Sequence, residues 1–260
     1  MREITSKDNK IVKLCEQLSA RKYRDKLSLY LIEGVNLLNE AVQENAEIET
    51  VLVRRGYAGD LPVPENKCFM LDEKLFDRVA QTDTSQGVMA IVKKTQFSPQ
   101  QFIEKTAKGN FVVLDRLQDP GNIGTIIRTA DAAGYSGIVV MKGTADIYSP
   151  KVVRAATGSL FRVPVVFMND NEQLISFVKA AGGKLVATCF DTDKYYYDVD
   201  LSENIALIIG NEGNGISQEL IDRAHLKIKI PMSGTIESLN ASVAAAILMY
   251  EKVRAGGKGL

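Results

Sequence analysis

The stretch LDRLQDPGNIGTIIRTADAAGY, residues 114–135, decides how the second half of the chain is interpreted. An apolar run, FVVLD, stops just before Asp119-Pro120-Gly121-Asn122, whose residue types are typical of a turn. A helical pattern follows at once, and its single cation, Arg128, stands among apolar residues: Ile123, Ile126, Ile127, Ala130 and Ala133. The pattern predicts a strand, a tight turn and a helix.

Working outward, the chain predicts two α/β units. After residue 108, apolar runs (FVVLD, GIVVM, VPVVF, KLVAT, IALIIG, LKIKI) separated by helical stretches predict a mostly parallel sheet with helices on both faces. Before residue 93, helix-period stretches (IVKLCEQL, VNLLNEAV, KLFDRVA) alternate with β-rich runs (LYLIEG, IETVLVRR, GVMAIV). Between them, Ser98-Pro99 predicts a helix start and Gly109 its stop. We therefore predict a small α/β domain at 1–92, a linker at 93–108 and a larger domain at 109–260.

The composition excludes several classes of protein. The 260 residues carry no formal net charge and the pI is about 6.6, so a nucleic-acid partner must meet a local patch. Residues 1–26 hold such a candidate, eight Lys or Arg against four acids, although a solvated helix face is the simpler explanation of this surplus. No apolar run approaches the ~18 residues of a membrane span, so we expect a soluble, cytoplasmic protein without a membrane partner.

The residues that serve as nucleophiles and metal ligands are sparse. Cys15, Cys68 and Cys189 are far apart and form no Cys-x-x-Cys pair, which indicates reduced thiols. His225 is the only histidine, so it alone could serve a catalytic triad, and no His-rich metal site can be built. We expect His225 to be structural or at the surface, and we expect no metal.

Arg128 needs an explanation if its helix is buried. An unpaired buried guanidinium costs several kcal/mol, so this arginine requires either a fixed acid or an anionic ligand. The sequence leaves both possibilities open. Asn122 has a simpler explanation, because it is a plausible N-cap of the same helix.

A second loop follows the apolar run IALIIG. Gly210, Glu212, Gly213 and Gly215 enter it, and glycines there would let a ligand approach the backbone, while Ser217 is the predicted N-cap of the next helix. The glycine spacing is not that of a dinucleotide-binding loop, and the position about 20 residues on holds an isoleucine instead of an acid. A phosphate-loop motif is also absent. These patterns disfavour a nicotinamide enzyme and an NTPase.

A third loop follows the run LKIKIP. Ser238-Leu239-Asn240 opens an Ala-rich helix that is apolar on all sides, which is typical of a core or dimer-interface helix with Ser238 as its N-cap. Ser238 and Asn240 would still face the loop.

Taken together, the three loops resemble the motifs of the SpoU (TrmH) family of the SPOUT class of RNA methyltransferases. The matching patterns are N-x-G-x3-R, I-G-N-E-G-x-G and I-P-M-x-G-x3-S-L-N-x-S-V-A, in this order. VVRAATGSLFRVPV (152–165) also resembles the family. YLIEGVNLLNEA and TSQGVMAIV resemble the small RNA-binding domain that precedes the catalytic domain in many members.

The resemblance implies a deep trefoil knot in the C-terminal domain, S-adenosylmethionine as cofactor, and a homodimer whose active sites draw residues from both subunits. By position, Gly210, Ile230 and Leu239 would contact the cofactor, chiefly through backbone atoms. The reaction centre would consist of Asn122, Arg128, Glu212, Ser238 and Asn240.

The implied reaction is methyl transfer to a ribose 2′-hydroxyl of RNA, most simply ribosomal RNA and otherwise transfer RNA. The basic N-terminal helix and Arg54-Arg55 would contact phosphates. Two rivals remain, a catalytically silent RNA-binding protein of the same fold and an enzyme that methylates a base nitrogen. The general base is open between Glu212 and Arg128, although a guanidinium is a poor proton acceptor. Glu212 could instead orient Arg128 or Asn122.

Overall fold

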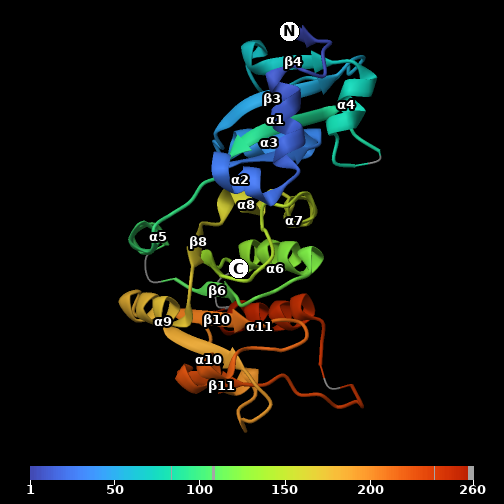
Figure 1. Ribbon diagram of the computed structural model, residues 1–260. Coiled ribbons are helices and arrows are strands. Elements are labelled where there is room, and N and C mark those ends of the chain that lie inside the picture. Colours follow the sequence, from blue (N-terminus) through green and yellow to red (C-terminus); the bar gives the residue numbers. More distant parts are fainter. Residues whose placement is uncertain (83, 107–108, 237, 257–260) are drawn as a thin grey trace. The chain divides into compact units, whose positions relative to one another are not determined.

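The structure, a computed structural model, describes residues 1–82, 84–106, 109–236 and 238–256 (Figure 1). Contacts group the chain into two units, Met1–Lys94 with Asp146–Phe161, and Thr95–Ala145 with Arg162–Leu260. The predicted domain limits concern function and stay predictions. In the described part of the chain, no helix is long and apolar enough to cross a membrane.

The first unit contains a mixed sheet with the strand order β1-β4-β3-β5-β2. β1 pairs parallel with β4 and β4 with β3, whereas β5 runs antiparallel to both of its neighbours. Its strands are β1 (Arg2–Ile4), β2 (Leu29–Glu33), β3 (Ile48–Arg54), β4 (Cys68–Leu71) and β5 (Val88–Lys93). Its helices are α1 (Lys10–Leu18), α2 (Arg21–Leu27), α3 (Val35–Gln43), α4 (Glu73–Val79), α7 (Pro150–Ala156) and the start of α8 (Ser159–Arg162), with the 3-10 turn η1 (Glu65–Lys67).

The segment 146–161 joins the first unit through buried polar contacts. The Arg24 guanidinium, only 5% exposed, donates to one carboxylate oxygen of Asp146 from Nε (2.8 Å) and Nη2 (2.6 Å). Arg24 Nη1 also donates to the carbonyls of Leu18 and Ser19. This arginine was expected among the exposed basic residues of the N-terminal segment, and that expectation is wrong, because its charge is neutralised inside the unit.

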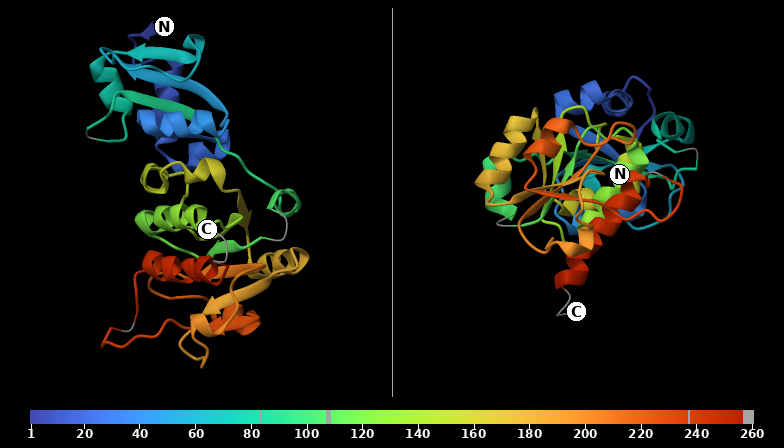
Figure 2. Two further views of the ribbon diagram at one scale, coloured as in Figure 1. Left: turned by 180° about the vertical axis from the view of Figure 1, so that it is seen from behind. Right: turned by 90° about the horizontal axis from the view of Figure 1, so that it is seen from below.

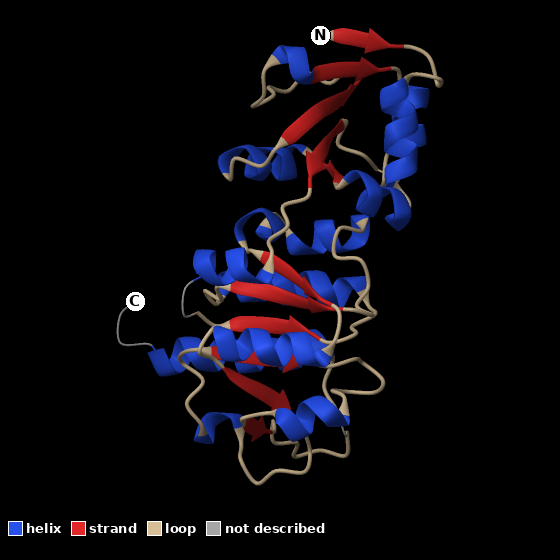
Figure 3. Cartoon of the chain, turned by 60° about the vertical axis from the view of Figure 1, so that its left-hand side comes forward, coloured by secondary structure: helices blue, strands red, loops and turns tan. Residues whose placement is uncertain are grey.

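The second unit is built on a six-stranded, fully parallel sheet with the order β11-β9-β10-β6-β7-β8 (Figure 3). All six predicted apolar runs form its strands, which confirms the predicted parallel sheet. The strands are β6 (Phe111–Leu114), β7 (Gly137–Met141), β8 (Val165–Met168), β9 (Lys184–Thr188), β10 (Ile205–Ile209) and β11 (Leu226–Ile228). The helices are α5 (Pro99–Thr106), α6 (Pro120–Ala132), α9 (Asn171–Ala180), α10 (Gln218–Arg223) and α11 (Ala241–Gly256), with the 3-10 turn η2 (Tyr196–Asp198).

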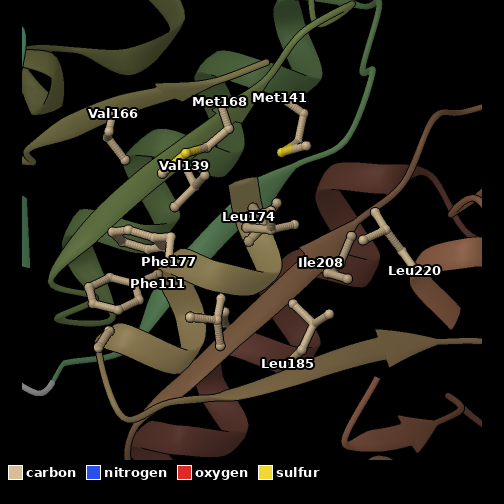
Figure 4. Close-up of a cluster of buried hydrophobic side chains, with 14 of the residues drawn as sticks. Phe111, Val139, Met141, Val166, Met168, Leu174, Phe177, Leu185, Ile208 and Leu220 are labelled. Atoms are coloured by element: carbon tan, nitrogen blue, oxygen red, sulfur yellow. The ribbon is translucent and has the colours of Figure 1, made fainter. Parts of the chain in front are cut away.

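Side chains alternate between the two faces of this sheet, as the strand period of two requires. On one face, Phe111, Val139 and Ile208 join a buried cluster with α5, α9 and α10 (Figure 4). Within this cluster, Phe102 and Phe177 pack edge to face. The other face buries Ile123 and Ile127 of α6, and α11 packs against α6 (Figure 2). Both faces of the sheet are therefore covered, as predicted. The trefoil knot stays a prediction.

Candidate active site

A cavity of about 660 Å³ lies in the second unit beyond the carboxyl ends of β9, β10 and β11. This is where an open parallel sheet places its ligands. The predicted cofactor residues Gly210, Ile230 and Leu239 all line it. Of the predicted reaction-centre residues, Glu212, Ser238 and Asn240 line it as well. The structure therefore brings the second and third loops together around one cavity.

The loop after β10 is locked onto itself. The backbone groups of Asn211 and Gly215 exchange both hydrogen bonds, at 3.2 and 2.8 Å, and Asn211 Oδ1 accepts from the amides of Gly213 and Asn214. A Cβ on Gly210 would stand 2.5 Å from backbone atoms of Gly215 and Ile216. The absence of a side chain at Gly210 thus makes room for the return of its own loop, and the expected approach of a ligand to this glycine stays a prediction.

A hydrogen-bonded relay joins the three loops. Asn240 Nδ2 donates to Asn122 Oδ1 at 2.9 Å, and Asn122 Nδ2 donates to Glu212 Oε1 at 3.2 Å. The Glu212 carboxylate also accepts from the backbone amides of Gln118 (3.0 Å) and Asp119 (3.1 Å). Side chains that are 90 or more residues apart in the sequence are thus held in one chain of contacts.

This environment keeps Glu212 ionised. Partial burial opposes ionisation of its carboxyl, but the backbone amides of Gln118 and Asp119, its own amide and the Asn122 side chain together outweigh burial and lower its pKa. A carboxylate whose pKa is lowered is a weaker proton acceptor than a free one. Glu212 could act as the general base or could orient Asn122, and these contacts favour the orienting role.

Arg128 does not behave as a buried cation. Arg128 is exposed on α6, so the expectation that its guanidinium is buried is wrong. Among the described residues it has no ion-pair or hydrogen-bond partner, and it is not among the residues that line the cavity. Glu212, its expected acid partner, is engaged with Asn122 and backbone amides instead. A structural ion pair within the described chain therefore does not explain Arg128.

Two predicted helix caps belong to other residues. Asp119, not Asn122, caps α6, because its side chain accepts from the amide of Asn122. Asn240, not Ser238, caps α11, because its Oδ1 accepts from the amides of Ser242 and Val243 at 2.9 and 3.3 Å. Neither Asn122 nor Ser238 is needed as a cap, so the structure leaves both side chains for another use. Ser217 caps α10, as predicted.

Several residues at this edge of the sheet were not predicted. Asp115, buried at the end of β6, forms a two-pronged contact with Arg116, with both N–O distances at 2.9 Å. The carbonyl of Arg116 accepts from Asn211 Nδ2, which ties the first loop to the second. Phe190 and Lys229 line the cavity. Helical and strand periodicity carries no signal for such contacts, because each joins residues from separate loops.

The basic residues expected to contact RNA phosphates, in the N-terminal segment and at Arg54-Arg55, are partly neutralised by acids. Arg54 lies 3.2 Å from Asp77, and Arg55 pairs with Glu3. Both arginines remain partly exposed, so an RNA phosphate would compete with these acids for them. Lys13 and Arg21 also face acids, Asp8 and Asp25 respectively.

The three cysteines and the single histidine do not line up as a catalytic triad or a metal site in the described part of the chain. All three thiols are free, and burial is the main factor that raises the pKa of Cys15, to about 12. His225 lies at the surface and its Nδ1 accepts from the Leu185 amide, so the expected structural or surface role is confirmed. The described residues contain no cluster of three metal-ligating side chains.

Comparison with known proteins agrees with this arrangement. The chain matches the SpoU rRNA Methylase family over residues 109–250 and an MRM3-like substrate binding domain over residues 9–90. It is 38% identical over 256 residues to the 23S rRNA (guanosine(2553)-2′-O)-methyltransferase RlmP of Bacillus subtilis, covering 96% of this chain and 98% of that one.

Two solved structures are also similar. The AdoMet-bound rRNA methyltransferase from Sinorhizobium meliloti has a TM-score of 0.86 and 33% identity, with 98% of each chain covered. The SpoU methyltransferase AviRb of Streptomyces viridochromogenes, solved with the cofactor AdoMet, has a TM-score of 0.84 and 30% identity, covering 96% of this chain and 100% of that one. Family match, relatives and site geometry agree, and this chain belongs to the SpoU rRNA methylase family.

Proposed function

We propose that this chain transfers a methyl group from S-adenosylmethionine to a ribose 2′-hydroxyl of large-subunit ribosomal RNA. The observation that carries the proposal is the relay Asn240–Asn122–Glu212, which fixes the side chains of all three family motifs beside one cavity. The similarity to a 23S rRNA 2′-O-methyltransferase along nearly the whole chain supports the choice of RNA and of ribose.

The cavity suits the cofactor. Its volume of about 660 Å³ lies within the range of small-molecule and cofactor sites. Its lining combines glycines of the loop after β10 with apolar residues such as Met232 and polar residues such as Lys229. Gly210, Ile230 and Leu239 would hold the cofactor there. When bound, S-adenosylmethionine supplies the reactive methyl group on its sulfonium.

The residues of the chain would act mainly by positioning. Alignment of two reacting groups can supply about 7–11 kcal/mol, whereas general-base catalysis typically gives about 10²- to 10⁴-fold in rate. The Glu212 carboxylate holds the Asn122 amide, and that amide in turn holds Asn240. We propose that Asn122, Asn240 and Ser238 orient the ribose hydroxyl, and that Glu212 fixes their arrangement.

Arg128 would act across a dimer. It lies on α6, the helix that packs against α11, and it is exposed and absent from the cavity of its own chain. A guanidinium without an acid partner suits an RNA phosphate or a developing alkoxide. We propose that α6 and α11 form the dimer interface and that Arg128 reaches the cavity of the partner subunit.

The remaining assignments follow from this reaction. The domain at 1–92 would bind RNA, the domain at 109–260 would hold the cofactor in a trefoil knot and dimerise, and residues 93–108 would link them. A cytoplasmic location suits an enzyme that acts on ribosomal RNA. Transfer RNA is a second candidate substrate, because neither the cavity nor the relay distinguishes the two RNAs.

The test uses the purified full chain, S-adenosylmethionine, and in vitro transcribed 23S rRNA and transfer RNA. A methylated 2′-oxygen is no longer a nucleophile, so the adjacent linkage should resist alkali and survive as a dinucleotide. Nucleoside mass spectrometry should find the methyl on ribose in the 23S rRNA. Methyl groups on a base would contradict the ribose assignment, and no methylation of either RNA would contradict the function itself.

A further inference from the structure

Three aromatic residues of one loop, Phe190, Tyr195 and Tyr197, lie close together in the sequence beside the proposed cofactor cavity; we call them the aromatic cluster, and of the three Phe190 lines the cavity. Phe190 lines the cavity and is 78% exposed, more than any other large apolar side chain in the described part of the chain. Tyr197 is 46% exposed and stacks on Tyr195, with ring centroids 5.4 Å apart and an interplanar angle of 18°. Exposed apolar surface beside a cavity often marks a binding site, and Phe190 combines high exposure with a place in the cavity wall.

One loop carries all three rings. Residues 189 and 196, near its two ends, donate backbone hydrogen bonds to the adjacent carbonyls of Ile228 and Lys229. Phe190 and Tyr195 therefore leave the sheet from neighbouring positions. The Lys229 ammonium lies 5.3 Å from the centre of the Tyr195 ring, and Lys229 also lines the cavity.

We propose that the Phe190–Tyr195–Tyr197 cluster stacks on an unpaired base of the RNA, next to the ribose that enters the cavity. The inference rests on the proposed function, since it requires RNA at this cavity. Proteins read single-stranded RNA by stacking splayed bases on aromatic side chains, and every base offers such a face. Lys229 supplies a cation beside the rings for the flanking phosphate.

Stacking, not charge, is the main attraction of this surface. The lysines near the aromatic cluster are Lys194, Lys227 and Lys229. Three acids of the loop that carries the aromatic residues, Asp191, Asp193 and Asp198, balance their charge. A purely electrostatic phosphate site would not carry that many carboxylates. The ligand recognised by the cluster is therefore a planar ring, and the contribution of the cluster to RNA binding should depend little on salt.

The chain contains no tryptophan, which gives a direct test. The variant Phe190→Trp places one fluorophore in the cluster. Phe167→Trp places one on β8, at the opposite edge of the sheet, where Phe167 is 40% exposed. With S-adenosylhomocysteine present, a short, unstructured, mixed-sequence RNA should quench the fluorescence of the Phe190→Trp protein and leave that of the Phe167→Trp protein unchanged. If S-adenosylhomocysteine alone quenches the Phe190→Trp protein and RNA adds nothing, the ring stacks on the cofactor and the proposal fails.

A kinetic comparison completes the test. Phe190→Ala should lower kcat/KM for in vitro transcribed 23S rRNA by about 5- to 150-fold, the range of one lost base stack. Affinity for S-adenosylmethionine, melting temperature and oligomeric state should not change, and Phe167→Ala should retain full activity. Unchanged kcat/KM, or a monomeric Phe190→Ala, would overturn the assignment. If the wild type methylates no RNA, the proposed function fails instead, and quenching of the Phe190→Trp protein by the short RNA then tests the cluster separately.

Discussion

Glu212 and Arg128 are the two charged members of the predicted reaction centre, and the structure treats them in opposite ways. Glu212 accepts hydrogen bonds from two backbone amides and one side-chain amide. Arg128 is exposed, and no polar partner contacts it among the described residues. Because Glu212 is already hydrogen-bonded in the free chain, it is suited to hold its neighbours in place. Arg128 has no such contacts among the described residues and is therefore available to a ligand.

The variant Arg128→Ala should therefore abolish methyl transfer without harming the fold. Its affinity for S-adenosylmethionine should stay within a few-fold of wild type, because Arg128 does not line the cavity. Arg128→Lys should rescue little, since a planar two-pronged donor becomes a point charge. Methyl incorporation, calorimetry of cofactor binding and thermal melting measure the three quantities. A large fall in melting temperature would instead indicate a structural role.

Glu212 gives a prediction with a definite pH dependence. Glu212→Gln should lower the free energy of unfolding at neutral pH by about 1 kcal/mol, a charge-assisted hydrogen bond discounted for exposure. Because folding lowers the pKa of this carboxyl, its stabilisation is complete above the ordinary value of 4.5 and is lost as pH falls through the folded value. In urea unfolding, the difference in stability between the two proteins should begin to shrink as the pH falls below 4.5 and vanish below the folded pKa. If the difference in the free energy of unfolding between wild type and Glu212→Gln did not change with pH, the hydrogen bonds would not stabilise the ionised carboxylate.

At the scale of elements, the loop after β10 depends on a single missing side chain. A Cβ on Gly210 would meet backbone atoms at 2.5 Å, whereas the nearest atom to a Cβ on Gly213 is at 3.7 Å. Gly210→Ala should therefore displace the loop, weaken S-adenosylmethionine binding and lower the rate of methyl transfer by about 10²-fold, the scale expected for a misplacement of ~1 Å. Gly213→Ala is the matched control and should bind nearly normally. Calorimetry distinguishes them, and equal affinities would show that the loop tolerates a shift.

The elements themselves were largely predictable, and the exceptions have physical reasons. The buried strands of the second unit are continuous apolar runs, so β6 to β11 were found. In contrast, β1 is a three-residue edge strand, β4 reads only CFML, and α2 is mostly charged, so none has a clear period. In the site, the motifs located the loops correctly, but the helix N-caps are Asp119 and Asn240 instead of the predicted Asn122 and Ser238. Hydrogen bonds between loops decide such details, and local sequence does not record them.

At the scale of the whole molecule, the Arg24–Asp146 pair binds a late segment into the first unit. Arg24→Ala would leave Asp146 buried and unpaired, which typically costs about 3–5 kcal/mol. Replacing Arg24 by Met and Asp146 by Leu together should recover most of that loss, because no uncompensated charge remains. Arg21→Ala, which removes an exposed bridge to Asp25, is the control and should change little. Urea unfolding checks the series, and equal losses for Arg24→Ala and Arg21→Ala would contradict the buried clamp.

The proposed dimer makes its own prediction, because each active site would need two chains. Arg128→Ala keeps an intact cavity but lacks the cation, and Gly210→Ala has the cation but a damaged cavity. Each should be inactive alone. If Arg128 acts in the partner's cavity, a mixed dimer contains one complete site, formed by the Arg128→Ala cavity and the arginine of the other chain. Random exchange makes about half of the dimers mixed, so the mixture should regain about a quarter of wild-type activity.

The mixing experiment distinguishes the two arrangements directly. If Arg128 served the cavity of its own chain, no mixed dimer would contain a complete site, and the mixture would stay inactive. Exchange of subunits can be followed with differently tagged chains, and light scattering gives the oligomeric state. Val243 and Tyr250, the exposed apolar residues of α11, offer a control. Val243→Asp with Tyr250→Asp should yield monomers, and adding these changes to both chains should remove the regained activity. Monomers that keep full activity would exclude a shared site.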